Sequence, residues 1–200
     1  MNAPLPPIPR LESARLLIEM PTLPDAERVR SFYERNRDFF HFWEPDHGEH
    51  IYTREFWQTV LPSYREEFER GQAVRVVLRR KDDLRGPIIG FIHYTQMIGG
   101  ALMSCSFGCN LDAAAEGKGY MTEAARAMME YLFGELQVHR INATYMPSNL
   151  RSMRLMRRLG FTVEGYAKDY LFVNGCWRDH VISSVVNPAH AAQSDTFENP

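Results

Sequence analysis

The sequence has few cysteines, little excess charge of either sign and no long apolar run. Its three cysteines, Cys105, Cys109 and Cys176, are too few and odd in number for a disulfide framework, so we expect a reducing compartment. The formal net charge of −2 offers no general basic surface, and we predict no sequence-specific binding of nucleic acid. No segment approaches the roughly 18 apolar residues of a membrane-spanning helix, and the first residues carry no apolar signal core. These absences predict a cytoplasmic protein without a membrane partner.

The remaining composition is that of a single globular domain. The chain has 200 residues, of which 44% are hydrophobic and 24% charged, which is enough for one ample core. Residues 1–14 begin with a proline-rich stretch and are expected to form an extended arm. The folded domain is expected to span residues 15–187, and the polar residues 188–200 are expected to be disordered.

Apolar periodicity predicts an α+β fold. Helices are expected where apolar residues recur at helical spacing, at 25–36, 53–70, 120–135 and 149–161. Strands are expected at 15–20, 74–80, 87–96, 102–111, 140–146, 162–173 and 176–186. Most strands follow one another through turns and should be antiparallel, but a helix separates 102–111 from 140–146, which makes these two a parallel pair in a right-handed βαβ unit. The pattern predicts a mixed, mostly antiparallel sheet of about seven strands flanked by about four helices.

A glycine turn lies at the start of this parallel unit. Glu116, Gly117, Lys118 and Gly119 connect the expected strand to the helix that begins at Tyr120. Glycines at such a turn let the backbone approach a ligand, and the first N–H groups of a helix are unpaired and suit a phosphate. Tight turns also carry glycines for conformational reasons alone, so the turn by itself leaves both interpretations open.

A second capped helix follows the parallel strand. Ser148 or Asn149 is expected as its N-cap and Gly160 as the residue that ends it. Asn149 and Ser152 can serve the helix end or contact a ligand. Three arginines share one face of this helix, and a solvated face and a phosphate or RNA contact are the two interpretations. These arginines are Arg151, Arg154 and Arg158.

An aromatic run from Phe39 to Asp46 follows no regular period. It ends in Trp43, Glu44 and Pro45, and its acids are either solvated groups on an ordered loop or contacts for a cationic substrate. The histidines that follow, as in His47-Gly48-Glu49-His50, lack the pattern of a metal site, and we expect no metal.

Together these motifs resemble the GNAT family of acetyl-CoA-dependent N-acetyltransferases over about Arg15 to Pro188. The glycine turn is similar to the family's pyrophosphate loop, and Asn149 to Phe161 is similar to the helix beside the pantetheine. More narrowly, several stretches look like the RimJ type of ribosomal-protein-alanine N-acetyltransferase. These stretches are Phe42–Pro45, Gly117–Ala124, His139–Ile141, Met146–Pro147, Glu164–Leu171 and Trp177–His180.

The resemblance implies the GNAT fold, acetyl-CoA as cosubstrate and acetyl transfer to the α-amino group of a protein N-terminus. The implied substrate is the N-terminal alanine of a small-subunit ribosomal protein, with the ribosomal small subunit as a further partner of a monomer or homodimer. Two alternatives stay open. One is an acetyltransferase for a small amine such as a drug, a polyamine or an amino-acid-like toxin; the other is a ribosome-assembly or acyl-CoA-binding factor with vestigial catalysis.

The resemblance also implies a cofactor-binding set along the parallel unit and the capped helix. Its members are Asn110, Leu111, Gly117, Lys118, Gly119, Tyr120, Met121, Thr122, Asn149 and Ser152. A backbone N–H at Asn110–Leu111 would hold the oxyanion. Many relatives protonate the leaving thiolate with a tyrosine, but Met156 stands at that position here, which makes Ser152 the candidate donor.

The acceptor side needs only a modest base, because an α-amino group has a pKa of about 7.7 to 8.0 and is partly neutral near pH 7. Given the resemblance, Glu44 is expected to be catalytic together with Ser152, and Trp43, Glu44 and Asp46 are expected to bind the substrate. Cys105 and Cys109 lie on an apolar strand, where we expect them to be inert, since direct transfer needs no acyl-enzyme.

Overall fold

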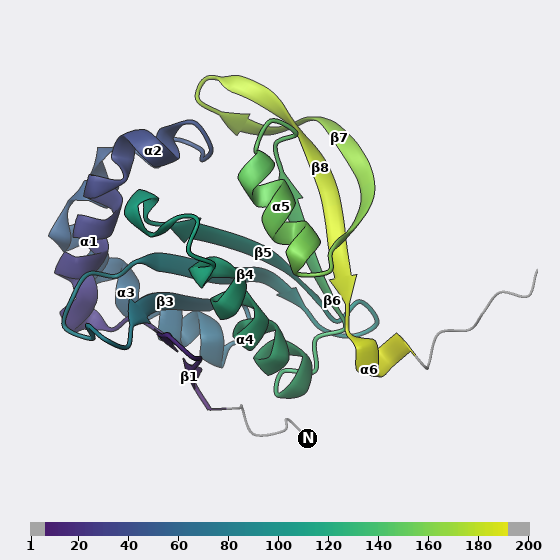
Figure 1. Ribbon diagram of the computed structural model, residues 1–200, viewed down its shortest axis with the longest axis horizontal. Coiled ribbons are helices and arrows are strands. Elements are labelled where there is room, and N and C mark those ends of the chain that lie inside the picture. The colour runs from purple at the N-terminus through teal and green to yellow at the C-terminus, as the bar shows by residue number, and fades with distance from the viewer. Residues whose placement is uncertain (1–6, 192–200) are drawn as a thin grey trace, which may run out of the picture.

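The computed structural model describes residues 7–191, which form one mixed sheet with helices on both faces (Figure 1). The sheet has eight strands in the spatial order β1-β2-β3-β4-β5-β6-β8-β7. The strands are β1 (Arg10–Glu12), β2 (Leu16–Glu19), β3 (Val74–Arg80), β4 (Gly90–Ile98), β5 (Ser104–Leu111), β6 (Arg140–Tyr145), β7 (Thr162–Val173) and β8 (Cys176–Val186). The helices are α1 (Ala26–Arg35), α2 (Arg37–His41), α3 (Arg54–Glu69), α4 (Tyr120–Gly134), α5 (Leu150–Arg158) and α6 (Pro188–Ala191).

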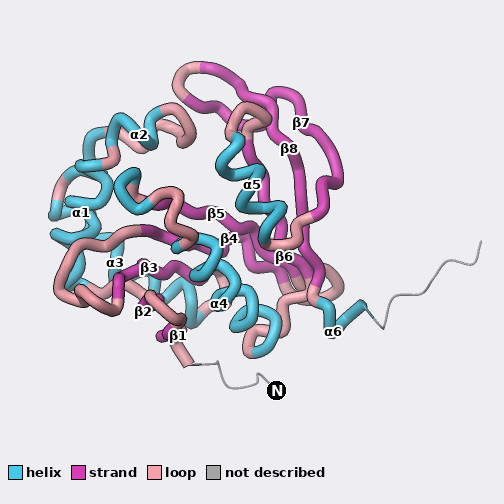
Figure 2. The backbone as a smooth tube through the Cα atoms, viewed as in Figure 1, coloured by secondary structure: helices cyan, strands magenta, loops and turns pink. Residues whose placement is uncertain are grey.

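The parallel pair β5–β6 divides the sheet. Residue pairing between these strands runs from Ser104 with Arg140 to Phe107 with Ala143 and then stops. Beyond that point β5 pairs only with β4, and β6 continues to pair with β8. The two strands therefore diverge toward their carboxyl ends. In Figure 2, β4 and β5 run toward α1 and α2, and the tip of the β7–β8 hairpin curves over toward α2, where Asn174 donates a hydrogen bond to the carbonyl of His41.

The two faces of the sheet carry separate cores, because neighbouring residues of a strand point to opposite sides. On one face Val76 and Ile92 pack with α4 and its buried Met128. On the other face Val77 and Phe91 pack with α1 and α3. Both faces of the sheet are thus covered by packed helices.

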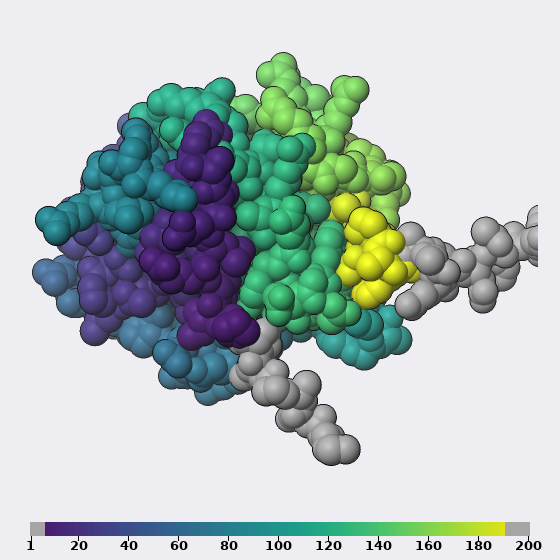
Figure 3. All heavy atoms as spheres, turned by 60° about the horizontal axis from the view of Figure 1, so that its bottom comes forward, coloured from purple at the N-terminus to yellow at the C-terminus, as the bar shows by residue number. Residues whose placement is uncertain are grey.

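The N-terminal strands lie alongside α4 on the surface shown in Figure 3. The hydroxyl of Tyr131 on α4 donates a hydrogen bond to the carbonyl of Pro7 at 2.9 Å. Nearby, Arg15 forms an ion pair of 2.6 Å with Glu123, also on α4. These contacts tie the start of the chain to the helix that follows the glycine turn.

The predicted α+β architecture with its parallel βαβ unit is confirmed, and several elements have the predicted bounds. β3, β7 and β8 begin and end at the predicted residues, and Asn174 and Gly175 have φ of +50° and +74°, as a two-residue hairpin turn requires. Asn149 is the N-cap of α5, and Gly160, with φ of +84°, follows its end. No helix within residues 7–191 has both the length and the apolar character needed to span a bilayer.

The structure differs from the sequence-based expectations at the ends of the chain and in the aromatic run. The eighth strand is β1, which lies within the expected arm and adds backbone pairing to the edge strand β2 without any apolar alternation of its own. Residues 188–191 form α6, where Asn187 accepts a hydrogen bond from the N–H of Ala189, so they are not disordered; residues 192–200, expected to be disordered, lie outside the described residues. Residues 39–41 belong to α2, and Glu135, expected as the last residue of the helix from 120, is exposed and lies just beyond the end of α4.

Candidate active site

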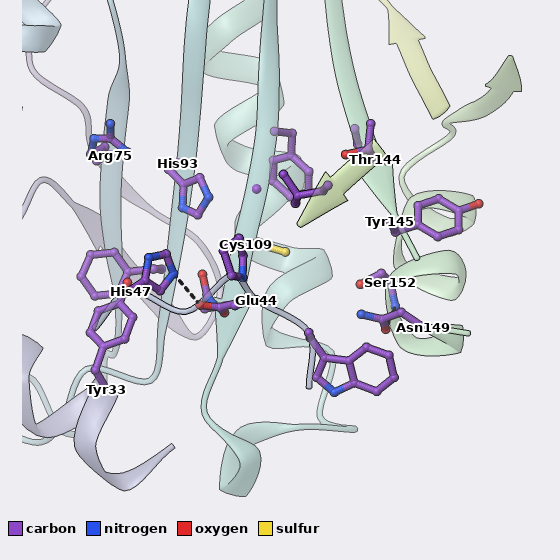
Figure 4. Close-up of a pocket in the computed structure, with 18 of the residues that line it drawn as sticks. Tyr33, Glu44, His47, Arg75, His93, Cys109, Thr144, Tyr145, Asn149 and Ser152 are labelled. Carbon is purple, nitrogen blue, oxygen red and sulfur yellow. Dashed lines mark hydrogen bonds and ion pairs between the residues drawn. The ribbon is translucent and has the colours of Figure 1, made fainter. Parts of the chain in front are cut away.

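The divergence of β5 and β6 opens a cavity of about 520 Å³. Its floor is formed by β4 and by residues 108–110 of β5, and one wall by residues 143–146 and the start of α5. The opposite wall is formed by the loop after α2, backed by aromatic side chains of α1 and α3. Figure 4 shows Glu44 and His47 on one side of this cavity and Asn149 and Ser152 on the other.

Asn149 and Ser152 lie on the α5 wall. The side-chain oxygen of Asn149 accepts a hydrogen bond from the backbone N–H of Ser152 at 3.1 Å, which makes Asn149 the N-cap. The cap uses only the backbone of Ser152, and its hydroxyl has no hydrogen-bond partner among residues 7–191. Both side chains line the cavity, as does the buried Met156.

Glu44 lies on the facing wall and is paired with His47. The distance between Glu44 Oε2 and His47 Nε2 is 3.4 Å, and the side chains are 22% and 47% exposed, respectively. This hydrogen bond raises the pKa of His47 above its usual range, against the opposing effect of burial. Trp43 lines the same wall, whereas Asp46 faces a neighbouring cavity and accepts a hydrogen bond from the N–H of Gly48 at 2.8 Å. The structure thus brings Trp43 and Glu44 to the main cavity but not Asp46.

His93 on the floor of the cavity is a residue that sequence reasoning missed. Its ring lies over Gly108, its register partner on β5, so that a Cβ at position 108 would stand 2.1 Å from His93 Nε2. Burial, with further contributions from the charges of Arg75 and His47, lowers the pKa of His93 to about 4, so the imidazole is neutral near pH 7. The available signal was a glycine inside a strand, which often marks a close approach of another group.

The glycine turn presents free backbone donors. Gly117 and Gly119 have φ of +72° and +79°, and Gly119 is the left-handed N-cap of α4. Within the described chain, the backbone N–H groups of residues 117–122 donate no hydrogen bond, and the dipole of α4 favours an anion there. The ammonium of Lys118 donates to the carbonyl of Ala114 at 2.8 Å, so it folds back onto the turn. The turn itself does not line the cavity.

Buried polar contacts hold the glycine turn in place. Asp112 accepts hydrogen bonds from Arg35 Nε at 2.5 Å and from the N–H of Ala114 at 2.9 Å. Asn36, next to Arg35 at the end of α1, accepts one from the N–H of Ala113 at 3.0 Å. The end of α1 therefore positions the segment that leads from β5 into the turn.

Arg151 connects the two walls of the cavity. Its guanidinium is 2.8 Å from Glu116 in the turn before α4 and lies 4.5 Å from the ring centroid of Phe39 and 5.5 Å from that of Trp43. A guanidinium at such distances from aromatic faces is attracted to them. Arg151 is thus not part of a free basic stripe, and its contacts place the glycine turn, α5 and the aromatic loop next to one another.

Asn110 and Leu111 differ in their position at the end of β5. Asn110 lines the cavity, whereas a methyl group of Leu111 packs beside Gly90 on β4. Beyond Phe107, β5 has no register partner on β6, so its backbone groups on that edge face the opening. Backbone groups without a strand partner on β6 therefore lie at the position where the resemblance implies an oxyanion donor, which stays a prediction.

Comparison with known proteins identifies the family. The Acetyltransferase (GNAT) domain family matches residues 15–162. The chain belongs to the GNAT acetyltransferase family. It is 37% identical over 179 residues to the [ribosomal protein uS5]-alanine N-acetyltransferase of Escherichia coli K12, covering 90% of this chain and 91% of that protein.

Solved GNAT structures agree with this assignment. The crystal structure of the ribosomal-protein-S5-alanine acetyltransferase from Vibrio fischeri matches with a TM-score of 0.85 and 30% identity over 90% of this chain and 97% of that chain. Mycobacterium smegmatis RimJ in complex with CoA-disulfide matches with a TM-score of 0.81 and 26% identity, over 90% and 85% of the two chains. The GNAT fold of this chain is therefore shared with structures that contain CoA.

The cysteines and histidines near this GNAT cavity offer neither a thiol nucleophile nor a metal site. Burial raises the pKa of Cys105 and of Cys109 to about 12, which keeps both as neutral thiols. His50 packs against the ring of Phe56 rather than beside His47. Among residues 7–191, no three His, Cys, Asp or Glu side chains form a group that could hold a metal ion.

Proposed function

We propose that this GNAT protein transfers the acetyl group of acetyl-CoA to the α-amino group of a protein N-terminus, with the N-terminal alanine of a ribosomal protein as substrate. The observation that carries the proposal is the pair of facing walls, which set the carboxylate of Glu44 opposite the hydroxyl of Ser152 at the divergence of β5 and β6. Similarity to acetyltransferases named for the alanine of uS5 supports the choice of substrate. The ribosomal protein would be met in the cytoplasm, alone or within the small subunit.

Acetyl-CoA fits the residues that are present. The free N–H groups of residues 117–122 would receive the pyrophosphate, and Lys118 adds positive charge beside them. Tyr120, Met121 and Thr122 would act through their backbone, because Met121 is buried in the core under α4. Asn149 and Ser152 would flank the thioester end of the cofactor.

The residues of the two walls supply the proton transfers of direct acyl transfer. Glu44 attracts the α-ammonium, which Trp43 would help to orient, and accepts a proton from it. The neutral amine then attacks the thioester carbonyl, and a backbone N–H near Asn110 holds the oxyanion. Ser152 donates a proton to the departing thiolate, a role that Met156 cannot fill, and its oxygen takes up the second proton that the nitrogen releases. Asp46, which faces away, would act only by its charge on the approaching substrate.

The test is an amine panel assayed with purified protein and acetyl-CoA. We expect turnover of an alanine-starting peptide, less of a serine-starting one, none of an Nα-acetylated control, and a kcat/KM for spermidine lower by roughly 10²-fold. Release of CoA thiol and mass spectrometry of the peptide measure the reaction. Transfer to spermidine but to no peptide would establish the small-amine alternative, and acetyl-CoA binding without any turnover would establish the vestigial one.

A further inference from the structure

Acetylation of an α-ammonium leaves one proton over in each turnover. The nitrogen loses two of its three protons, one proton ends on the sulfur of CoA, and the other must reach solvent. Glu44, as the acceptor, faces a cavity walled by aromatic side chains, among them Tyr33 and Trp57, which form a stacked pair with centroids 5.0 Å apart. Glu44 must lose its proton before the next turnover, so the site needs a path for it.

A second cavity, of about 410 Å³, adjoins the wall that carries Glu44. Five residues line both cavities, namely Tyr33, Glu44, Pro45, His47 and Ile51. The remaining lining of the outer cavity is mostly polar, with the carboxylates of Asp38, Asp46 and Glu49 and the guanidinium of Arg37, which pairs with Glu49. It offers a polar space, with more acids than bases, directly behind the proton acceptor.

Glu44 and His47 are the titratable pair in this shared wall. Burial raises the pKa of Tyr33, the third titratable residue of the wall, far above 10, so Tyr33 keeps its proton near neutral pH. The imidazole Nε2 of His47 is 3.4 Å from Glu44 Oε2, and Figure 4 marks this contact. His47 is also the more exposed of the two side chains, at 47% against 22%.

We propose that His47 carries the released proton from Glu44 to water in the outer cavity. This inference rests on the proposed function. The proton that Glu44 takes from the α-ammonium crosses to Nε2 of the neutral imidazole, which regenerates the carboxylate. The imidazolium then releases a proton to water, which returns His47 to its neutral form. No electrons move, and the one proton that leaves equals the one proton that the overall reaction produces.

The charges around His47 suit acceptance and release near neutral pH. Glu44 and Asp46, on its own loop, raise the pKa of His47; the acids Asp38 and Glu49 face the same outer cavity, as do His41 and Arg37, which pairs with Glu49. From the sheet side the neutral His93 and the cation Arg75 face the inner cavity. A relay works best when its pKa lies near the operating pH.

The experiment compares wild type with His47→Gln, which keeps a polar side chain beside Glu44 but cannot accept and release a proton. We expect kcat to fall by roughly tenfold or more, with the KM values for peptide and acetyl-CoA within about twofold. Wild-type kcat should fall as the pH drops below the pKa of His47, because only neutral His47 accepts a proton, and this limb should vanish in the variant. Free imidazole should restore kcat, since the outer cavity can admit it. His41→Gln is the matched control, because His41 lines only the outer cavity, and it should behave as wild type.

Every other result contradicts either the relay alone or both the relay and the proposed function. If wild type acetylates no N-terminal peptide, the proposed function and the relay both fail. If wild type is active and His47→Gln keeps its kcat and pH profile, the relay alone fails. If the variant is slow but imidazole gives no recovery and the KM for peptide rises in step, His47 only holds Glu44 in place, and the relay again fails. Circular dichroism melting of both variants verifies that the fold is kept.

Discussion

At position 108, a hydrogen atom occupies the place where any other residue would carry a carbon. That carbon would stand 2.1 Å from Nε2 of His93, well inside contact distance. Glycine at position 108 therefore makes room for the neighbouring His93 ring. Its own backbone conformation does not call for glycine, since its φ is not positive, in contrast to those of Gly117 and Gly119. Gly108 lets His93 lie flat over β5, and this position of the ring gives the cavity floor its shape.

Gly108→Ala should damage the active site more than the fold. The added methyl group displaces the ring of His93 into the space used by the substrate, and we expect the KM for peptide to rise by roughly tenfold, a loss of about 1.4 kcal/mol in binding. Steady-state kinetics measure this change. In the double variant Gly108→Ala/His93→Ala the clash is absent, and KM should return to that of His93→Ala alone. Equal effects of Gly108→Ala in both backgrounds would contradict the steric explanation.

At the start of α5, Asn149 and Ser152 contribute different groups to the helix cap. Asn149 supplies the side chain that caps the helix, whereas Ser152 contributes its backbone N–H to the cap and leaves its hydroxyl free. Of the two interpretations that the sequence left open, the helix cap is confirmed for the Asn149 side chain, and ligand contact stays a prediction. Asn149 is a cap whose side chain also lines the cavity, and Ser152 serves the helix end without using its side chain.

Asn149→Ala and Ser152→Ala should consequently have opposite profiles. Loss of the cap is expected to reduce the free energy of unfolding by about 1 kcal/mol. Ser152→Ala should leave that free energy nearly unchanged but lower kcat by roughly 10²-fold, because the thiolate loses its proton donor. Chemical denaturation and steady-state assays of both variants measure the contrast. A Ser152→Ala protein with wild-type kcat would remove Ser152 from the catalytic machinery.

Across the whole molecule, the sequence predicted what depends on neighbouring residues. Apolar periodicity, capping residues and turn glycines act over a few positions, and they located β3, β7, β8 and the cap of α5. Contacts between segments far apart in the chain could not be predicted from these local signals. The bond from Arg35 to Asp112 joins residues far apart in the chain, and the placement of His93 over Gly108 depends on strand register. β1 was missed because its short pairing needs only backbone groups.

The same distinction between local signals and distant contacts applies to the candidate site. Asn149, Ser152 and the glycine turn lie on elements with clear local signals, whereas the choice of Glu44 depended on the resemblance to the GNAT family. Asp46 was assigned to the same site, but it lines only the outer cavity and accepts a hydrogen bond from the N–H of Gly48. His47 was weighed only as a metal ligand, because its contact with Glu44 and its place between two cavities cannot be read from spacing.

The stability of the whole domain should depend on pH through Asp25. Its carboxylate is buried, which by itself raises its pKa, but hydrogen bonds from the Thr22 backbone and the charge of Arg79 outweigh this and lower the pKa below 3.8. A depressed folded-state pKa adds stability that is complete above the unfolded value and is lost as the pH falls through the folded value. We expect Asp25→Asn to cost about 2 kcal/mol at pH 7 and progressively less below pH 3.8. Urea denaturation at several pH values measures this, and a constant difference would contradict it.

The short pairing between β5 and β6 affects the distance between the two walls of the active site. Within the sheet, four pairs of residues join the strands before the cavity to the strands after it. Glu44 belongs to the part that precedes this junction and Ser152 to the part that follows it. This junction, together with the contacts of Arg151 between the walls, sets the span between proton acceptor and proton donor. The backbone pairing of β5 with β6 therefore contributes to the distance at which the two substrates are held from each other.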